Sequence, residues 1–372
     1  MKIGIFTFHY AHNYGAVLQA YALKTYLQKC GHIVEIINYR NKKISSNYKR
    51  KLHVTCNLRD IIHLKRLYGH IKFFLNLKYA QIEWNEQYNK FEAFIQKYLS
   101  KDREITYSDL LDYVEKYDIL FTGSDQVWAS NLTGGLDKVY LLDFPFSGRK
   151  ASYAASNGNC YIKESERNLM KKSLSNFYAI STRESKLSDT IMNDLNLFSQ
   201  CVVDPTLLLK KEDYSIFLDK NKKTKEKFVF VYYVAEDRTM SLFSKKVADQ
   251  LGYKLIELHY FSKKDFDKET QFANFGPEDF IQAINDSSLI ITNSFHGTAL
   301  SIIFQKNFYS YYLHNDRIEN LLNKISLENR HVGPGFSVEI ENISIDYNVT
   351  NRELSNYRKS SKDYIAKIFE DY

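Results

Sequence analysis

Apolar runs of strand type alternate with segments of helical apolar spacing through the second half of the chain. The strand-type runs lie at 228–234, 253–258, 289–292 and 307–312, and the helical spacing lies at 238–251, 277–285 and 297–304. Short uninterrupted apolar runs are typical of strands buried on both faces, and strands that alternate with helices form parallel sheets. The pattern therefore predicts an α/β domain in this half.

The first half shows the same alternation, interrupted by one long segment. Strand-type runs lie at 2–8, 33–39, 117–122, 150–155, 177–182 and 200–203, with helical spacing at 15–30 and 163–176. The opening strand, helix and strand have about the length of a βαβ unit. Residues 41–116 instead predict basic, aromatic helices without strand-like alternation, so we interpret them as an insertion between strands.

The length of the chain predicts more than one domain. Its 372 residues exceed what one hydrophobic core usually supports. Asp204-Pro205 follows the last strand pattern of the first half, and proline stops both a sheet and a helix. We therefore expect an N-terminal α/β domain over 1–207, including the insertion, and a C-terminal one over 208–350. Residues 351–372 predict a final amphipathic helix.

Positive charge is concentrated in the first part of the insertion. The whole protein has a formal net charge of +7, whereas residues 40–78 contain eleven Lys or Arg and one acid, Asp60. Two interpretations fit this segment: a solvated helical surface, or a patch that contacts an anionic membrane or substrate. No recognised nucleic-acid motif accompanies the charge, so we do not expect a nucleic-acid partner.

The apolar runs do not indicate a membrane span, and the cysteines do not indicate a metal site. The longest apolar runs are far shorter than the roughly 20 residues that span a bilayer, and the N-terminus enters a strand without a cleavage site. We therefore expect a cytoplasmic protein, peripheral at the inner face of the plasma membrane if residues 40–78 bind lipid. The cysteines, at 30, 56, 160 and 201, have no metal-ligand spacing, so no metal site is expected.

Polar residues follow several of the predicted strands, where open α/β sheets bind ligands. His296 lies at the turn from the strand at 289–292 into the next helix, whose free N–H groups favour an anion, so an imidazole there could act as an acid. The alternative is that His296 only caps its helix. Arg183, at another strand-to-helix junction, could hold a carboxylate or phosphate with two hydrogen bonds, or could be a surface charge beside Glu184.

Two loops of the first half carry further candidates. Asp125 follows the strand at 117–122 and could accept a hydrogen bond from a substrate hydroxyl. The loop 9–15 lies where dinucleotide-binding folds cradle phosphate, but the glycine fingerprint is absent, which argues against a nicotinamide cofactor. Asn13 and Gly15 could still offer an amide and a backbone N–H to a ligand, or could be ordinary turn residues.

Four stretches spread over the chain share a resemblance to one family. They are FHYAHNYGAVLQAYAL at 8–23, TGSDQVW at 122–128, ISTRE at 180–184 with VVDPTLLL at 202–209, and ITNSFHGTALSIIF at 291–304. Together they resemble the polysaccharide pyruvyl transferase family. The resemblance implies a glycosyltransferase type B fold, in which two Rossmann-like domains face each other across a cleft and the C-terminal helix returns to the first domain.

The resemblance also implies a reaction and its participants. The donor would be phosphoenolpyruvate, and the acceptor a sugar of a cell-envelope or exopolysaccharide precursor, including a lipid-linked oligosaccharide. The product would be a pyruvyl ketal, and no cofactor is implied. His296 matches the family's acid/base histidine and Arg183 an arginine that holds the donor, and we expect Asp125 to orient the acceptor hydroxyl or to act as a base.

The remaining expected contacts fall into two groups. Those to the donor are Ser294, Gly297, Thr298 and Arg317, and those to the acceptor or the cleft are Asn13, Tyr14, Gly15, Ser124, Gln126 and Asn293.

Position 294 departs from the family pattern, because several members have arginine there and this chain has Ser294. Either backbone N–H groups, Arg183 and Arg317 take over anion binding, or the donor differs. Two alternatives therefore stay open. One is a glycosyltransferase that uses a nucleotide-sugar donor on the same fold, and the other is a non-catalytic carbohydrate-binding protein of an envelope-assembly complex.

Overall fold

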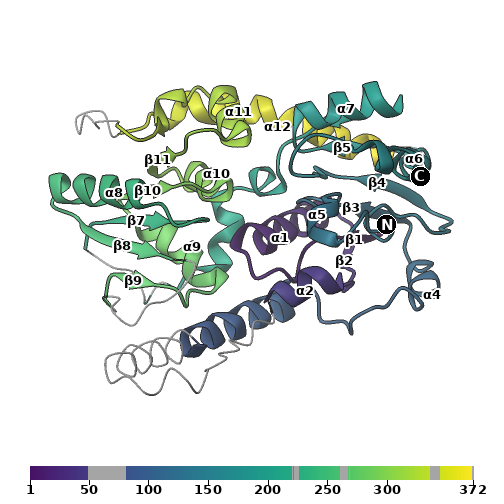
Figure 1. Ribbon diagram of the computed structural model, residues 1–372, viewed down its shortest axis with the longest axis horizontal. Coiled ribbons are helices and arrows are strands. Elements are labelled where there is room, and N and C mark those ends of the chain that lie inside the picture. Colours follow the sequence, from purple (N-terminus) through teal and green to yellow (C-terminus); the bar gives the residue numbers. More distant parts are fainter. Residues whose placement is uncertain are drawn as a thin grey trace, which may run out of the picture.

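The computed structural model describes residues 1–48, 81–219, 221, 226–259, 267, 269–335 and 344–370. Within these residues, parallel strands form two separate lobes (Figure 1). The first lobe contains, in spatial order, β2 (Ile33–Ile36), β1 (Lys2–Phe6), β3 (Ile119–Thr122) and β4 (Arg149–Ser152), and then the pair β5 (Ser181–Thr182) and β6 (Gln200–Cys201). The second lobe contains β12 (His331–Val332), β11 (Asn307–Tyr311), β10 (Leu289–Thr292), β7 (Phe228–Tyr232), β8 (Lys254–Leu258) and β9 (Gln271–Phe272).

The order of the strands identifies both lobes as doubly wound. Numbered along the chain within each lobe, the spatial order is 2-1-3-4-5-6 in the first and 6-5-4-1-2-3 in the second. In folds of this type ligands bind where the order reverses, at the carboxyl ends of the strands. The reversals lie between β1 and β3 and between β7 and β10. The expected α/β fold, with two Rossmann-like domains in the glycosyltransferase type B arrangement, is therefore confirmed.

Helices surround the two sheets (Figure 1). The α-helices are α1 (Tyr14–Lys29), α2 (Lys42–Tyr48), α4 (Leu110–Val114), α5 (Ser130–Thr133), α6 (Glu164–Leu174), α7 (Ser185–Leu195), α8 (Arg238–Leu251), α9 (Pro277–Asp286), α10 (Phe295–Ile303), α11 (Asp316–Lys324) and α12 (Tyr347–Phe369). Shorter helices are the π-helix η2 (Ile95–Leu99), which follows a helix over 81–94, and the 3-10 helices η3 (Pro205–Leu208), η4 (Lys211–Phe217) and η6 (Glu328–Arg330).

Two segments differ from the pattern-based expectation. Of the strand expected at 177–182, only β5 remains, because the preceding residues meet β4 through a single bridge between Ala151 and Ala179. The insertion is largely helical where it is described, yet Ile105 pairs with Tyr39 in one parallel bridge. Residues 49–78 of the basic segment lie outside the described residues. Among the described helices, none is long and apolar enough to cross a membrane.

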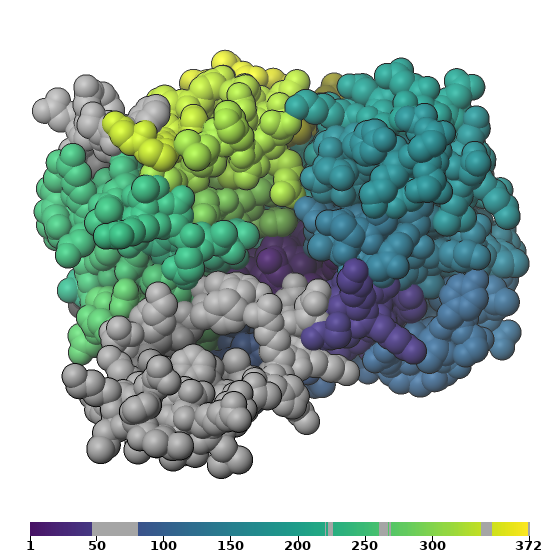
Figure 2. Space-filling view, viewed as in Figure 1, coloured from purple at the N-terminus to yellow at the C-terminus, as the bar shows by residue number. Residues whose placement is uncertain are grey.

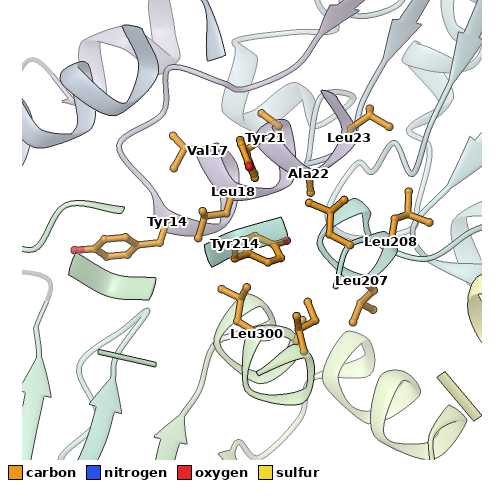
Figure 3. Close-up of a cluster of buried hydrophobic side chains, with 14 of the residues drawn as sticks. Tyr14, Val17, Leu18, Tyr21, Ala22, Leu23, Leu207, Leu208, Tyr214 and Leu300 are labelled. Carbon is orange, nitrogen blue, oxygen red and sulfur yellow. The ribbon is translucent and has the colours of Figure 1, made fainter. Parts of the chain in front are cut away.

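Helix α1 is buried between the two lobes. Its sequence is apolar around most of its circumference, which favours burial on all sides over a solvent-facing position. Leu18 and Tyr21 of α1 belong to one buried cluster with Tyr214 of η4 and Leu300 of α10 (Figure 3). Burial of each such side chain contributes about 2 kcal/mol to stability. The N-terminus of α1 is therefore held firmly at the boundary between the lobes.

Helix α12 connects the second lobe back to the first (Figure 1). At its start, the Tyr347 hydroxyl donates to the carbonyl of Lys306, at 2.6 Å. Near its end, the Tyr364 hydroxyl donates to the Ser152 carbonyl of β4, at 2.7 Å, and Arg149 donates to the Ile368 carbonyl, at 2.8 Å. The helix is about 35 Å long at 1.5 Å per residue, so it braces both lobes along one side.

Candidate active site

A cavity of about 300 Å³ lies between the lobes, at both reversals of strand order. Its walls come from the loops that follow β1, β3, β7 and β10, represented by Ala11, Asp125, Val234 and Asn293. Figure 2 shows a hollow between the two lobes, with N-terminal residues, in purple, on its floor. The carboxyl ends of both parallel sheets thus face one cavity, which is where this fold binds ligands.

Three helices begin at the cavity. Asn13 caps α1 by accepting from the Ala16 N–H at 3.2 Å, Ser294 caps α10 by accepting from the Gly297 N–H at 3.2 Å, and Asn315 caps α11 by accepting from the Ile318 N–H at 3.3 Å. All three capping residues line the cavity. Because the N-terminus of a helix carries partial positive charge, their convergence favours an anionic ligand.

The imidazole of His296 lies in the first turn of α10, between Asp204 and α1. Its Nε2 is 3.5 Å from Oδ2 of Asp204, and only 14% of the His296 side chain is exposed. Across the ring, Gly15 leaves the room that the imidazole occupies, because a Cβ at position 15 would lie 2.1 Å from Nδ1. The ring is therefore oriented by a carboxylate through one nitrogen, as in histidines that act as acids or bases.

Asp204 is a fully buried carboxylate that the sequence analysis treated only as a domain junction. Oδ1 accepts from the Thr206 N–H at 3.0 Å and from the Thr206 hydroxyl at 2.7 Å, and Oδ2 accepts from Arg183 at 3.1 Å. Burial alone would raise the pKa of Asp204, but His296, Arg183 and Thr206 together hold it well below its usual range. Asp204 is thus a permanent negative charge behind His296.

Arg183 differs from the expectation of a cation that faces the donor. Its side chain is 3% exposed and is ion-paired with Asp204 and, at 3.3 Å, with Glu184. It borders a small void behind the main cavity and does not line the main cavity itself. Sequence spacing could not reveal this, because the Asp204 partner follows Arg183 by 21 residues and meets it only in the folded sheet. The geometry assigns Arg183 to the support of Asp204.

Among the described residues, Arg317 is the Lys or Arg side chain that lines the cavity. It lies in the first turn of α11, is mostly buried, and forms no hydrogen bond or ion pair with the described residues. Burial, and to a lesser extent Arg183, lowers the pKa of Arg317, but a guanidinium remains charged at neutral pH. A half-buried cation without a counter-ion among the described residues favours an anion from solution.

Asp125 and Gln126 line the opposite wall, in the loop after β3. Asp125 has a φ of 83°, in the left-handed region that costs a residue other than glycine on the order of 1 kcal/mol. Its carboxylate accepts from the Gln126 N–H at 2.8 Å, and the residue is partly exposed. The strained backbone thus holds an accessible carboxylate in the cavity.

Other expected site residues are divided between the cavity and the core. Asn293 lines the cavity, but its amide accepts from the Val234 N–H at 2.8 Å and donates to the Ala235 carbonyl at 2.9 Å, so it fastens the loop after β7. The residues that are buried and do not line the cavity are Tyr14, Gly15, Ser124, Gly297 and Thr298. They shape the site from behind, because their neighbours in sequence form its surface.

Asp204 and Asn315 are the site residues that sequence reasoning missed. An acid directly after a strand was a usable signal for Asp204, since carboxyl ends of strands bear functional groups. Asn315 is a good capping residue, so the helix N-terminus at this position could also have been predicted from the sequence. Within the described part of the chain, no group of three or more His, Cys, Asp or Glu side chains is placed to hold a metal ion.

Solved structures with a similar fold share little sequence identity with this chain. No protein of curated function matches the sequence significantly. Among solved structures, a putative UDP-N-acetylglucosamine 2-epimerase from Listeria monocytogenes is 10% identical with a TM-score of 0.48, over 100% of this chain and 92% of that one. UDP-GlcNAc 2-epimerase from Neisseria meningitidis bound to UDP-GlcNAc is 11% identical with a TM-score of 0.46, over 99% of this chain and 100% of that one.

A family model matches most of the sequence. The model of the family described as polysaccharide pyruvyl transferase matches residues 13–315. That range includes Asp125 and His296 together with the loops that follow β3, β7 and β10, whereas Phe8, Ala11 and Arg317 of the cavity lie outside it. The chain therefore belongs to the polysaccharide pyruvyl transferase family.

Proposed function

We propose that this enzyme transfers the pyruvyl group of phosphoenolpyruvate to a sugar of a cell-envelope or exopolysaccharide precursor and forms a pyruvyl ketal. The observation that carries the proposal is the pairing, in one cavity, of a carboxylate-supported histidine with a half-buried arginine that has no counter-ion among the described residues. A trianionic enol phosphate needs cations for binding and a proton donor for reaction, and the cavity offers both.

Arg317 and the helix N-termini at Asn13, Ser294 and Asn315 would bind the phosphate and carboxylate of the donor. Ser294 stands where several family members have arginine, and Arg317 lines the same cavity. A cation on α11 would therefore replace one on α10. Arg183 would contribute indirectly, because its charge is already neutralised by Asp204 and Glu184.

His296 would begin the reaction by giving a proton to C3 of phosphoenolpyruvate, which converts the methylene to a methyl group and leaves C2 electron-deficient. The buried carboxylate of Asp204, 3.5 Å from Nε2, would orient the imidazole for this transfer. A sugar hydroxyl then forms a bond to C2, and Asp125 would accept the hydroxyl proton. The C2–O bond to phosphate breaks, a second hydroxyl of the sugar attacks C2, and its proton leaves with the inorganic phosphate.

A mass-spectrometric assay tests this reaction. The enzyme is incubated with phosphoenolpyruvate and a library of envelope sugars, free, nucleotide-linked and lipid-linked. The expected product has the mass of the acceptor plus pyruvic acid minus one water, with release of one phosphate. No such product from any acceptor, with a protein that unfolds cooperatively, would count against the proposal.

A binding experiment separates this proposal from a nucleotide-sugar glycosyltransferase. Thermal unfolding is followed with phosphoenolpyruvate or with UDP-, GDP- and CMP-sugars at equal concentration, for the wild type and for Arg317→Ala. Phosphoenolpyruvate should raise the melting temperature of the wild type and should raise that of Arg317→Ala much less. Stabilisation by a nucleotide sugar alone would favour the glycosyltransferase.

A further inference from the structure

A second cavity, of about 360 Å³, lies on the other side of the loop that joins β1 to α1. Successive residues of this loop face the two cavities in turn. Tyr10 and His12 line the second cavity, whereas Ala11 and Asn13 line the candidate active site. Helix α2 borders both, through Ile44 in the active site and Ser45 in the second cavity. The two cavities therefore share a wall about one residue thick.

The polar groups of the second cavity are held in fixed positions. Glu92 contacts His12 through Oε1, at 2.9 Å from Nε2, and Arg40 through Oε2, at 3.7 Å. Burial alone would raise the pKa of Glu92, but His12 and Arg40 lower it, so Glu92 is a carboxylate at neutral pH. Arg40 is itself anchored, since its Nε donates to Asn38 at 3.0 Å and its guanidinium lies over the ring of Tyr10 at 5.7 Å.

An aromatic surface completes the cavity. Tyr88 is half-buried, with its ring 4.5 Å from that of His12 and 5.3 Å from that of Trp84. Planar polar side chains with two hydrogen-bonding atoms match adjacent hydroxyl groups, and an aromatic face matches the C–H face of a sugar ring. The cavity therefore has both kinds of surface that a sugar needs.

The charges of the second cavity cancel. Its described lining residues include two cations, Arg40 and Lys42, and two carboxylates, Glu92 and Glu104. An anion would meet the carboxylates at close range, whereas a neutral ligand with hydroxyl groups can pair with both signs. In the candidate active site, by contrast, three helix N-termini add positive charge to the pair of Arg317 and Asp125, which favours an anion. The two cavities thus select different chemistry.

We propose that the second cavity binds a neutral sugar residue of an oligosaccharide acceptor, while the sugar that receives the pyruvyl group occupies the active site. That this sugar is part of an acceptor rests on the proposed function, whereas the preference of the cavity for a neutral sugar rests on its lining residues alone. The acceptor would then span the loop between Tyr10 and Asn13, and its recognition would need at least two sugar residues.

Titration calorimetry of the full-length protein tests this proposal without turnover. The probes are neutral oligosaccharides of glucose, galactose and N-acetylglucosamine, the corresponding monosaccharides, and inorganic phosphate. Tyr88→Ala removes the aromatic face and Glu92→Gln keeps the shape while removing the charge, and each should weaken oligosaccharide binding by about fivefold or more. Tyr178→Ala is the control, because Tyr178 is 50% exposed and lines neither cavity.

The outcomes separate this proposal from the proposed function. Loss of oligosaccharide binding in Tyr88→Ala and Glu92→Gln, with an unchanged melting temperature in at least one of them, supports the second cavity even if phosphoenolpyruvate does not stabilise the protein. Oligosaccharide binding that is absent in the wild type, or that stays at the wild-type level in both variants, overturns it. Binding of inorganic phosphate that both variants weaken also overturns it, because the second cavity would then be an anion site. Stabilisation by phosphoenolpyruvate should be the same in Tyr88→Ala as in the wild type.

Discussion

Substitution of Gly15 by alanine moves the His296 ring without removing any polar group. A Cβ at position 15 would lie 2.1 Å from Nδ1 and 2.5 Å from Cε1 of that ring. Ordinary contacts begin near 3.4 Å, so the ring must retreat by about 1.3 Å. It cannot do so and keep its 3.5 Å distance from Asp204 and its place beside the helix N-terminus.

The expected effect on activity is much larger than the effect on stability. A misplacement of about 1 Å costs a catalytic group about 10²-fold in rate. The ring lies at the edge of the cavity and can move into it, so the backbone need not shift. In addition, alanine is favoured over glycine in a helix by up to about 1 kcal/mol. Gly15→Ala should therefore lower turnover about 100-fold while the free energy of unfolding changes by less than about 1 kcal/mol.

The assay combines ketal formation, measured by mass spectrometry, with thermal unfolding. Gln28→Ala is the matched control, because it adds an alanine to the same helix at an exposed position far along α1. Turnover of Gly15→Ala within about threefold of the wild type would refute the idea that the ring position controls the reaction. Equal losses in both variants would assign the effect to the helix and not to the ring.

Three further predictions concern the same site and one distant cluster. His296→Ala should lower turnover by roughly 10² to 10⁴-fold and leave stabilisation by phosphoenolpyruvate intact, because a proton donor acts mainly in the transition state; near-normal turnover would remove it from the mechanism. Arg317→Ala should greatly reduce that stabilisation in a normally folded protein. Arg183→Ala should instead cost about 3–5 kcal/mol of unfolding free energy, because buried Asp204 loses its permanently charged partner; chemical denaturation distinguishes the two. His259 follows β8 in the second lobe, with Nδ1 at 3.0 Å from Glu236 and Nε2 at 3.8 Å from Glu257. Burial lowers the pKa of His259, but the two glutamates raise it to about 9, so its stabilising contribution is complete below pH 6.5 and is lost as the pH rises through 9. The melting temperature should fall more steeply above pH 8 in the wild type than in His259→Gln.

Local sequence was enough for the features that depend on neighbouring residues. The apolar run at 289–292, the capping serine at 294 and the apolar helix that follows predict a strand-to-helix turn, and β10 and α10 form that turn with His296 in the first helical turn. Burial of a strand and capping of a helix involve residues within one or two turns of each other, so their signal lies in a short window of sequence. The alternation of such windows likewise predicted the α/β class, and the family resemblance implied two Rossmann-like domains.

The partners of the charged residues depended on the packing of the two lobes. Arg183 was a reasonable donor cation by position, yet folding pairs it with Asp204 and leaves Arg317 as the cation that lines the cavity. Asp204 reaches His296 across 92 residues of sequence, where no periodic pattern connects them. The reason is physical: apolar burial is specified by each segment's own composition, whereas the charge that an ionised group meets is specified by whichever segment is packed against it.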